Sequence, residues 1–191
     1  NAANLTDLQL TNTTIDVANG AGVRTAVTID KTNSGLITVS GNGEGIAFEN
    51  ADGSATTGNL DLSGSSGLTI NVTGSGGTGI YANTTGTVDT AAYVTVGNAA
   101  GGPALKLGSG VTSATNRGIL ESASATASTV DTANATTFTN ADTGVITASA
   151  AGTPTLAMSA ANATMNNAGL INGDVVMNGA NATVNNTGTV S

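Results

Sequence analysis

The chain contains no cysteine, histidine or tryptophan, and aromatic residues make up 2% of its 191 positions. Histidine is the most frequent general base of enzymes, so its absence argues against hydrolytic chemistry. The absence of cysteine suits a protein exported through an oxidising compartment, where stray thiols form wrong bridges. So few large side chains cannot fill the core of a round domain, and we expect a thin core repeated along the chain.

Charge is also scarce, because 8% of the residues are charged, whereas an average globular domain has about a quarter. The formal net charge is −8, and the four basic residues stand singly at Arg24, Lys31, Lys106 and Arg117. This distribution argues against nucleic acid or an anionic membrane as the partner. The chain also lacks an apolar run long enough to span a bilayer.

The composition leaves two classes open, a disordered chain and a repetitive fold. Chains rich in Gly, Ser and Thr often fail to collapse. Two prolines, little charge and the regular return of Val, Ile and Leu favour the repetitive fold. The chain opens on Asn1 without a signal peptide, so we expect an extracellular segment that is a fragment of a longer exported protein.

A short phrase, Asn-x-Gly followed by two aliphatic or β-branched residues, returns along the chain. It stands at 33–37, 116–120, 167–171 and 186–190, with looser copies at 84–88 and 142–146. With Gly67 as a degenerate copy, the marker glycines are Gly35, Gly67, Gly86, Gly118, Gly144, Gly169 and Gly188, separated by 32, 19, 32, 26, 25 and 19 residues. Such intervals are typical of a solenoid with fixed strands and variable turns. We therefore predict an all-β fold, a parallel β-helix (β-solenoid) of roughly seven to eight coils, with residues 1–191 as a single unit.

Aliphatic side chains follow the marker glycines at a fixed distance. Six of the seven markers have one two residues later, namely Ile37, Val88, Leu120, Ile146, Ile171 and Val190. Because side chains alternate along a strand, we expect these six to face the core at one position of the coil. Gly67 is one residue out of phase, which predicts a bulge or a shorter turn there.

Further strands follow from other similarities. Residues 43–48 resemble 77–82, and 102–107 and 153–158 are later variants of the same segment. Period-two alternation predicts strands at 23–29, 60–62 and 94–96. The alanine-rich stretch 123–135 is rich in Thr, Ser and Val, so we expect strand or loop rather than helix there.

The asparagine of the phrase has a structural interpretation. Side-chain amides one coil apart, at about 4.8 Å, can hydrogen-bond to each other. We therefore predict an internal ladder of Asn33, Asn116, Asn167 and Asn186 at one corner. Phe138, Met165 and Val184 precede their markers in a similar way, which predicts an apolar stack.

The acidic residues do not form a convincing catalytic group. Glu44, Glu49 and Asp52 are the closest cluster, and Asp89 is expected to approach Glu121 or Asp61 across coils. Such clusters are more often solvated turns than sites, and no histidine is available as a partner. We therefore predict no catalytic residue, no cofactor and no metal site.

The two tyrosines are the candidate contact residues. If Ile80, Ala82, Val94 and Val96 face inward, alternation places Tyr81 and Tyr93 on the outer surface. In a chain this poor in aromatic residues, exposed tyrosines are candidate anchors for a partner, although isolated surface aromatics are also common.

The phrases within 33–47 and 167–190 resemble the passenger repeats of Gram-negative type V autotransporters, and this similarity extends from about residue 20 to the end. The resemblance implies a right-handed parallel β-helix, exported by a C-terminal outer-membrane β-barrel and displayed on the bacterial surface or secreted. The implied partners are a host cell-surface protein or glycan, or like chains in self-association. The Gly-Asp-Ser-Gly motif of the proteolytic passengers is missing here, so the implied function is non-enzymatic adhesion, self-association or receptor binding.

Two other functions stay open. A polysaccharide-binding or polysaccharide-degrading β-helix protein needs a carboxylate groove for its chemistry. An ice-binding solenoid needs Thr-x-Thr rows that align in every coil. Thr-x-Thr occurs at 11–13 and 137–139, but not at the coil period.

Overall fold

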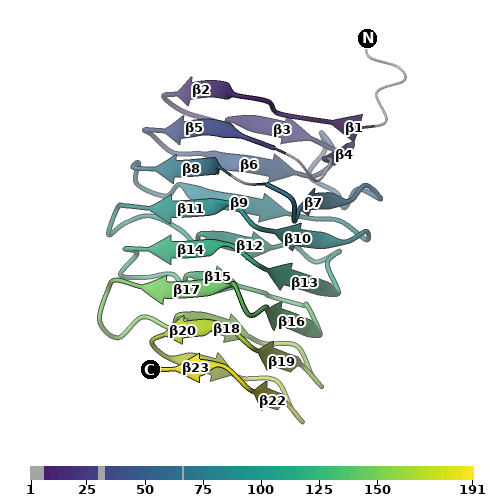
Figure 1. The fold of residues 1–191 in the computed structure, drawn as a ribbon, viewed down its shortest axis with the longest axis vertical. Helices are drawn as coiled ribbons and strands as arrows, with labels where there is room; N and C mark the ends of the chain where they lie inside the picture. Colours follow the sequence, from purple (N-terminus) through teal and green to yellow (C-terminus); the bar gives the residue numbers. More distant parts are fainter. Residues whose placement is uncertain (1–6, 30–32, 66) are drawn as a thin grey trace.

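The computed structural model describes residues 7–29, 33–65 and 67–191, and these residues form 23 strands and no helix. The strands are arranged in three parallel sheets of eight, eight and seven strands, which we call sheets A, B and C. Each turn of the chain adds one strand to each sheet, and successive turns stack along one axis (Figure 1). The protein is therefore a parallel β-helix, as the repeat predicts, with seven three-strand coils and two strands of an eighth.

The bounds of the strands, in stacking order, define the coils. Sheet A consists of β1 (Asp7–Leu8), β4 (Thr28–Ile29), β7 (Leu60–Leu62), β10 (Val88–Thr90), β13 (Ser113–Asn116), β16 (Thr137–Asn140), β19 (Thr164–Asn167) and β22 (Thr183–Asn186). Sheet B consists of β2 (Thr13–Val17), β5 (Gly35–Val39), β8 (Leu68–Val72), β11 (Tyr93–Val96), β14 (Ile119–Ser122), β17 (Val145–Ala148), β20 (Leu170–Asn172) and β23 (Thr189–Val190). Sheet C consists of β3 (Val23–Thr25), β6 (Glu44–Phe48), β9 (Thr78–Ala82), β12 (Leu105–Leu107), β15 (Val130–Asp131), β18 (Leu156–Met158) and β21 (Val175–Met177). Coil 1 is β1–β3, and each later coil takes the next three strands.

Alternation along each strand produces the thin core. In β8, Leu68, Ile70 and Val72 are buried, while the two residues between them are half-buried on the outer surface. The same inward position of sheet B is filled in successive coils by Ile15, Ile37, Ile70, Val94, Leu120, Ile146, Ile171 and Val190. Five of the six predicted members of this row are therefore confirmed. The out-of-phase Gly67 is explained as well, because Leu68 and not Gly67 pairs with Gly35.

Two predictions about strands are wrong. Val88 belongs to sheet A, where it pairs with Leu60 and Ala114, because Gly86 marks a different corner of the coil. The alternation at 23–29 is not one strand, since it divides into β3 in sheet C and β4 in sheet A. A turn lies between them, and period two continues through it by coincidence.

The related segments 43–48, 77–82, 102–107 and 153–158 contain β6, β9, β12 and β18, which are equivalent strands of sheet C in different coils, as their similarity predicts. Ile46 pairs with Ile80, Ile80 pairs with Leu105, and Val130 links this row to Leu156. The alanine-rich stretch contains only the two-residue strand β15 and connecting loop. In sheet A, the apolar stack that begins at Phe138 is confirmed.

The asparagine ladder exists, but its membership differs from the prediction. Each amide donates to the next along the axis: Asn116 to Asn140 at 2.9 Å, Asn140 to Asn167 at 2.8 Å and Asn167 to Asn186 at 2.7 Å. Asn33 is buried outside this row, where its side-chain oxygen accepts from the backbone N–H of Leu10. Asn140 was not predicted, because the connection from it to Gly144 is two residues longer than the corresponding Asn-x-Gly.

Candidate functional site

The acidic cluster of the first coils, Glu44, Glu49 and Asp52, is divided between an ion-pair network and a turn. Arg24 lies 3.5 Å from Glu44 and forms a hydrogen-bonded ion pair with Glu49. Asp52 instead accepts hydrogen bonds from the hydroxyl and backbone N–H of Ser54, which lower the pKa of Asp52. Arg24 therefore bridges the carboxylates of Glu44 and Glu49 and offsets one of their two negative charges, and the third carboxylate fixes a loop.

Asp89 lies beside one of the two alternative neighbours expected for it. It pairs in register with Asp61 in sheet A, as predicted, whereas Glu121 lies in sheet B. The Nε of Arg117 lies 3.0 Å from both carboxylate oxygens of Asp89. The single N–H of Nε is thus shared between the two oxygens, and this ion pair neutralises one acid of the Asp61–Asp89 pair.

The described residues offer neither a metal site nor a membrane-spanning helix. Within residues 7–29, 33–65 and 67–191, no three His, Cys, Asp or Glu side chains are grouped so as to hold a metal ion. In the same ranges, no helix has the length and apolar character needed to cross a membrane. The outer faces of the three sheets remain as candidates.

Tyr81 and Tyr93 both lie on outward positions, but they belong to different sheets. Tyr93 in β11 is 42% exposed, and its hydroxyl donates to the carboxylate of Glu121 at 3.1 Å. This hydrogen bond is the main reason that the pKa of Tyr93 is raised. Tyr81 in β9 is half-buried, and burial raises its pKa, with a smaller contribution from the nearby Glu49. The two tyrosines therefore do not form a single contact site.

Tyr93 belongs to a longer row that runs along the outer face of sheet B. We call this row, from coil 2 to coil 7, the sheet B stripe: Leu36, Thr69, Tyr93, Ile119, Val145 and Leu170. Five of its six side chains are apolar or aromatic, and Leu36, Tyr93, Ile119 and Leu170 are 37–42% exposed. The stripe contains four of the six large hydrophobic residues that are exposed in the described structure.

A second outward row lies beside the stripe on the same strands. It contains Thr38, Asn71, Thr95, Glu121, Thr147 and Asn172 in coils 2 to 7. Only Glu121 in this set carries a charge. The outer face of sheet B therefore combines an apolar row with an almost neutral row of hydrogen-bonding groups.

The outer face of sheet A is polar throughout coils 5 to 8. Two rows of small side chains alternate there with the inward residues. We call them the sheet A polar face: Ser113, Thr137, Thr164 and Thr183 in the first row, and Thr115, Thr139, Asn166 and Asn185 in the second. The first row therefore aligns a hydroxyl in every one of these coils, although on this face Thr-x-Thr itself occurs in only one of them, at 137–139, in agreement with the sequence analysis.

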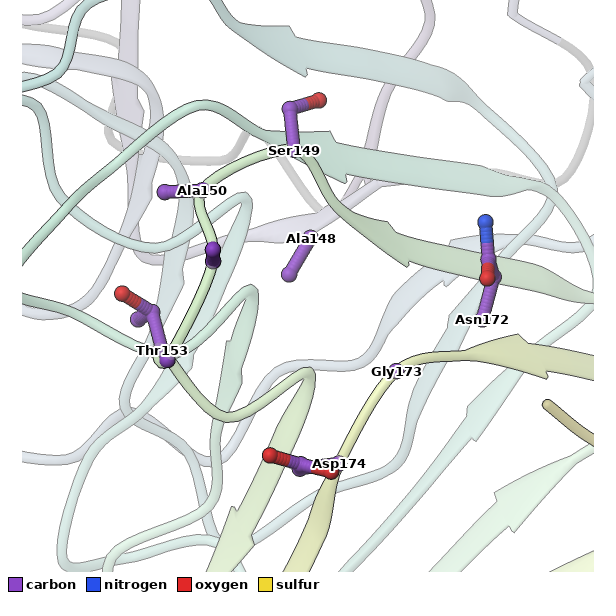
Figure 2. A pocket seen from close by; sticks show the side chains of 9 residues that line it. Ala148, Ser149, Ala150, Thr153, Asn172, Gly173 and Asp174 are labelled. Atoms are coloured by element: carbon purple, nitrogen blue, oxygen red, sulfur yellow. The ribbon is translucent and has the colours of Figure 1, made fainter.

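A hollow of about 250 Å³ lies where coils 6 and 7 pass from sheet B to sheet C. Figure 2 shows the loop 149–153 curving around Ala148, with Asn172, Gly173 and Asp174 on the other side. Its only ionisable lining group is Asp174, which is exposed. The hollow thus contains no pair of carboxylates for glycoside hydrolysis.

Sequence reasoning identified the outward tyrosines but neither outer face. Recognising a row requires the register between coils, and the varying loop lengths conceal it in the sequence. Comparisons with protein-family models, with curated proteins and with solved structures give no match to this chain.

Proposed function

We propose that this chain is a non-enzymatic binding rod, displayed outside a bacterial cell or secreted, that acts in adhesion by self-association or by binding a host-cell surface. The observation that carries the proposal is the sheet B stripe. Contiguous exposed apolar surface on a soluble protein marks an interaction site more often than isolated apolar residues do. In a chain with two tyrosines and few large side chains, concentration of these residues in one row is a specific feature.

The stripe has the composition of a contact surface. Tyr93 is an aromatic residue of the type that anchors protein interfaces, and Ile119 and Val145 extend its apolar surface along the axis. The neighbouring row supplies hydrogen-bonding groups such as Thr95 and Thr147. An apolar centre beside a polar margin is the usual arrangement of a protein–protein interface.

A second copy of the chain fits this face in an antiparallel arrangement. A two-fold axis between coils 4 and 5 brings Tyr93 of one copy against Ile119 of the other. The same operation places Glu121 opposite Thr95, so the acidic side chains of two copies do not meet. Such an isologous contact lets two chains with a net charge of −8 associate without direct repulsion at the interface.

The expected area indicates a weak individual contact. A face of about 30 by 15 Å buries roughly 450 Å² on each partner, compared with about 800 Å² in a standard interface. A single pair of rods therefore dissociates readily. Many rods displayed together on opposing cells bind with much higher avidity, because each contact raises the effective concentration of the next.

Sedimentation velocity across protein and salt concentrations tests the proposal. We expect reversible dimers at high concentration, and at least a five-fold weaker association for the double variant I119T/L170T. The matched control is V176T, which removes an apolar side chain from the outer face of sheet C. A strict monomer at high concentration contradicts self-association, and equal weakening by V176T contradicts the assignment to sheet B.

A further inference from the structure

The first row of the sheet A polar face presents unpartnered hydroxyl groups. The side-chain hydroxyls of Ser113, Thr137, Thr164 and Thr183 have no hydrogen-bond partner among the described residues. Three of the four residues are threonines, whose β-branch restricts χ1, so the positions of these three hydroxyl oxygens are restricted before any ligand arrives. Groups that are already ordered lose little conformational entropy when they bind.

The second row is partly occupied by bonds between its own side chains. Asn185 donates to the side-chain oxygen of Asn166 at 2.9 Å, and Asn166 donates to Thr139 at 3.5 Å. The second row has hydroxyls only at Thr115 and Thr139, so the row of hydroxyls that continues through all four coils is a single line along the axis and not a two-dimensional lattice. A linear ligand fits this arrangement better than ice, which requires hydroxyl pairs repeated in every coil.

The face is neutral, although the molecule is acidic. None of its eight side chains is charged, and the Arg117–Asp89 ion pair lies at its border with coil 4. The net charge of −8 repels nucleic acid, acidic glycans and anionic membranes. The charges thus favour a neutral ligand that is rich in hydroxyl groups.

The spacing selects the conformation of that ligand. Neighbouring coils present their hydroxyls about 4.8 Å apart, in a straight line over four coils. One sugar of an extended β-linked polysaccharide advances by nearly the same distance. A coiled α-linked chain turns away from a straight row after a few sugars.

We propose that the sheet A polar face binds a neutral, extended, β-linked polysaccharide that lies along the axis of the β-helix with one sugar beside each coil. The threonine hydroxyls exchange hydrogen bonds with sugar hydroxyls, and the threonine methyl groups contact the C–H faces of the rings. Each contact is weak, and repetition along a polymer provides the affinity. This inference does not depend on the sheet B stripe.

Native gel electrophoresis with polysaccharide included in the gel tests the proposal. We expect hydroxyethyl cellulose, a soluble β-1,4-glucan derivative, to retard the protein. Soluble starch, which is α-linked and coiled, and polygalacturonate, which is acidic, are expected to leave its mobility unchanged. Failure of hydroxyethyl cellulose to retard the protein, or equal retardation by starch, overturns the proposal.

Matched variants assign the binding to the face. T137V/T164V/T183V removes three hydroxyls of the first row and is expected to weaken retardation at least ten-fold. The control T38V/T95V/T147V makes the same three changes on sheet B and is expected to bind like the parent. Circular dichroism checks that both are folded, and T164R, which blocks the row by a single change, provides a second test. Unchanged binding by T164R and the triple variant overturns the proposal, whereas I119T/L170T must leave retardation intact.

Discussion

The first four coils and the last four close the corner between sheets B and C by different means. In the early coils, Gly45 and Gly79 let the backbone approach sheet B, because a Cβ on either glycine would stand 2.2 Å from a methyl carbon of that sheet. In later coils, the corresponding position holds Thr129 and Thr155. Their hydroxyls donate, at 3.0 Å each, to backbone carbonyls of β17 and β20.

The corner between sheets A and B also changes from apolar packing in the early coils to side-chain hydrogen bonding in the later ones. Its inward position is Leu62 in coil 3 and Thr90 in coil 4. From Asn116 in coil 5 onward, that position belongs to the asparagine ladder. At these two corners, the close apolar packing of Gly45, Gly79 and Leu62 thus gives way to side-chain hydrogen bonds, which begin at Thr90 in coil 4. The second solution is tolerated because no buried side-chain N or O of the described residues lacks a partner.

The largest effect is expected from a methyl group added to the glycine corner. Gly79→Ala places a Cβ 2.2 Å from Val94 and 2.4 Å from the carbonyl oxygen of Ala104. Because a backbone oxygen cannot move aside as a flexible side chain can, we expect a loss of about 3 kcal/mol. Urea unfolding followed by circular dichroism measures it. Gly97→Ala is the control, since its nearest atom is 3.9 Å away, and equal midpoints for the two variants would falsify the packing argument.

A smaller loss is expected from the middle of the ladder. Asn140→Ala removes the acceptor of Asn116 and the donor to Asn167, all three of which are buried. Leaving buried amides with fewer partners costs about 2 kcal/mol. The same unfolding measurement on Asn166→Ala, which cuts a half-exposed amide contact, should show less than half of this loss. If Asn140→Ala lowers the stability no more than Asn166→Ala does, the ladder does not stabilise the second half of the molecule in the way proposed.

A still smaller loss of stability is expected at the corner between sheets B and C that contains Thr129 and Thr155. Thr129→Val keeps the shape of the side chain but loses its hydrogen bond to the carbonyl of Thr147. We expect a loss of about 1 kcal/mol. Thr147→Val, on a half-buried outer position whose hydroxyl makes no such bond within the described part of the chain, serves as the matched control. If Thr129→Val instead raised the stability, the hydrogen bond would not be what stabilises this corner in the later coils.

The smallest effect concerns the two tyrosines, whose raised pKa values have different main causes. With two tyrosines and no tryptophan, an alkaline absorbance titration follows Tyr81 and Tyr93 alone. Both should titrate above the ordinary value of 10.0. The hydrogen bond to Glu121 stabilises the neutral Tyr93 side chain, so its contribution is complete below the ordinary pKa and is lost as pH rises through the raised one.

Glu121→Gln separates the two groups. The pKa of Tyr93 should fall towards its ordinary value, because the charged acceptor is removed, while the pKa of Tyr81 should not change. A fall in the pKa of both tyrosines towards the ordinary value would indicate a general change in the fold instead of the loss of one hydrogen bond.

The sequence allowed the class of fold and most inward rows to be predicted, because the inward positions of sheet B have a strict chemical requirement. Its limit was the length of the connections. Val88 was placed in the wrong row because Gly86 marks a different corner, and Asn140 was missed because two extra residues separate it from its glycine. Alternation showed that Tyr93 points outward, but not that Ile119 lies beside it.

The stacking of the coils also determines how the rod responds to force. The hydrogen bonds between parallel strands run along the axis, so a pull on the two ends loads them one coil at a time. The residues from Ile146 to Ile171 form one repeat of 25 positions. Released from the stack, such a repeat extends from about 4.8 Å to roughly 85 Å. A rod of this kind lengthens in steps, one coil at a time, while its remaining coils stay folded. Stepwise unfolding of this kind limits the force that a sudden pull transmits along the chain.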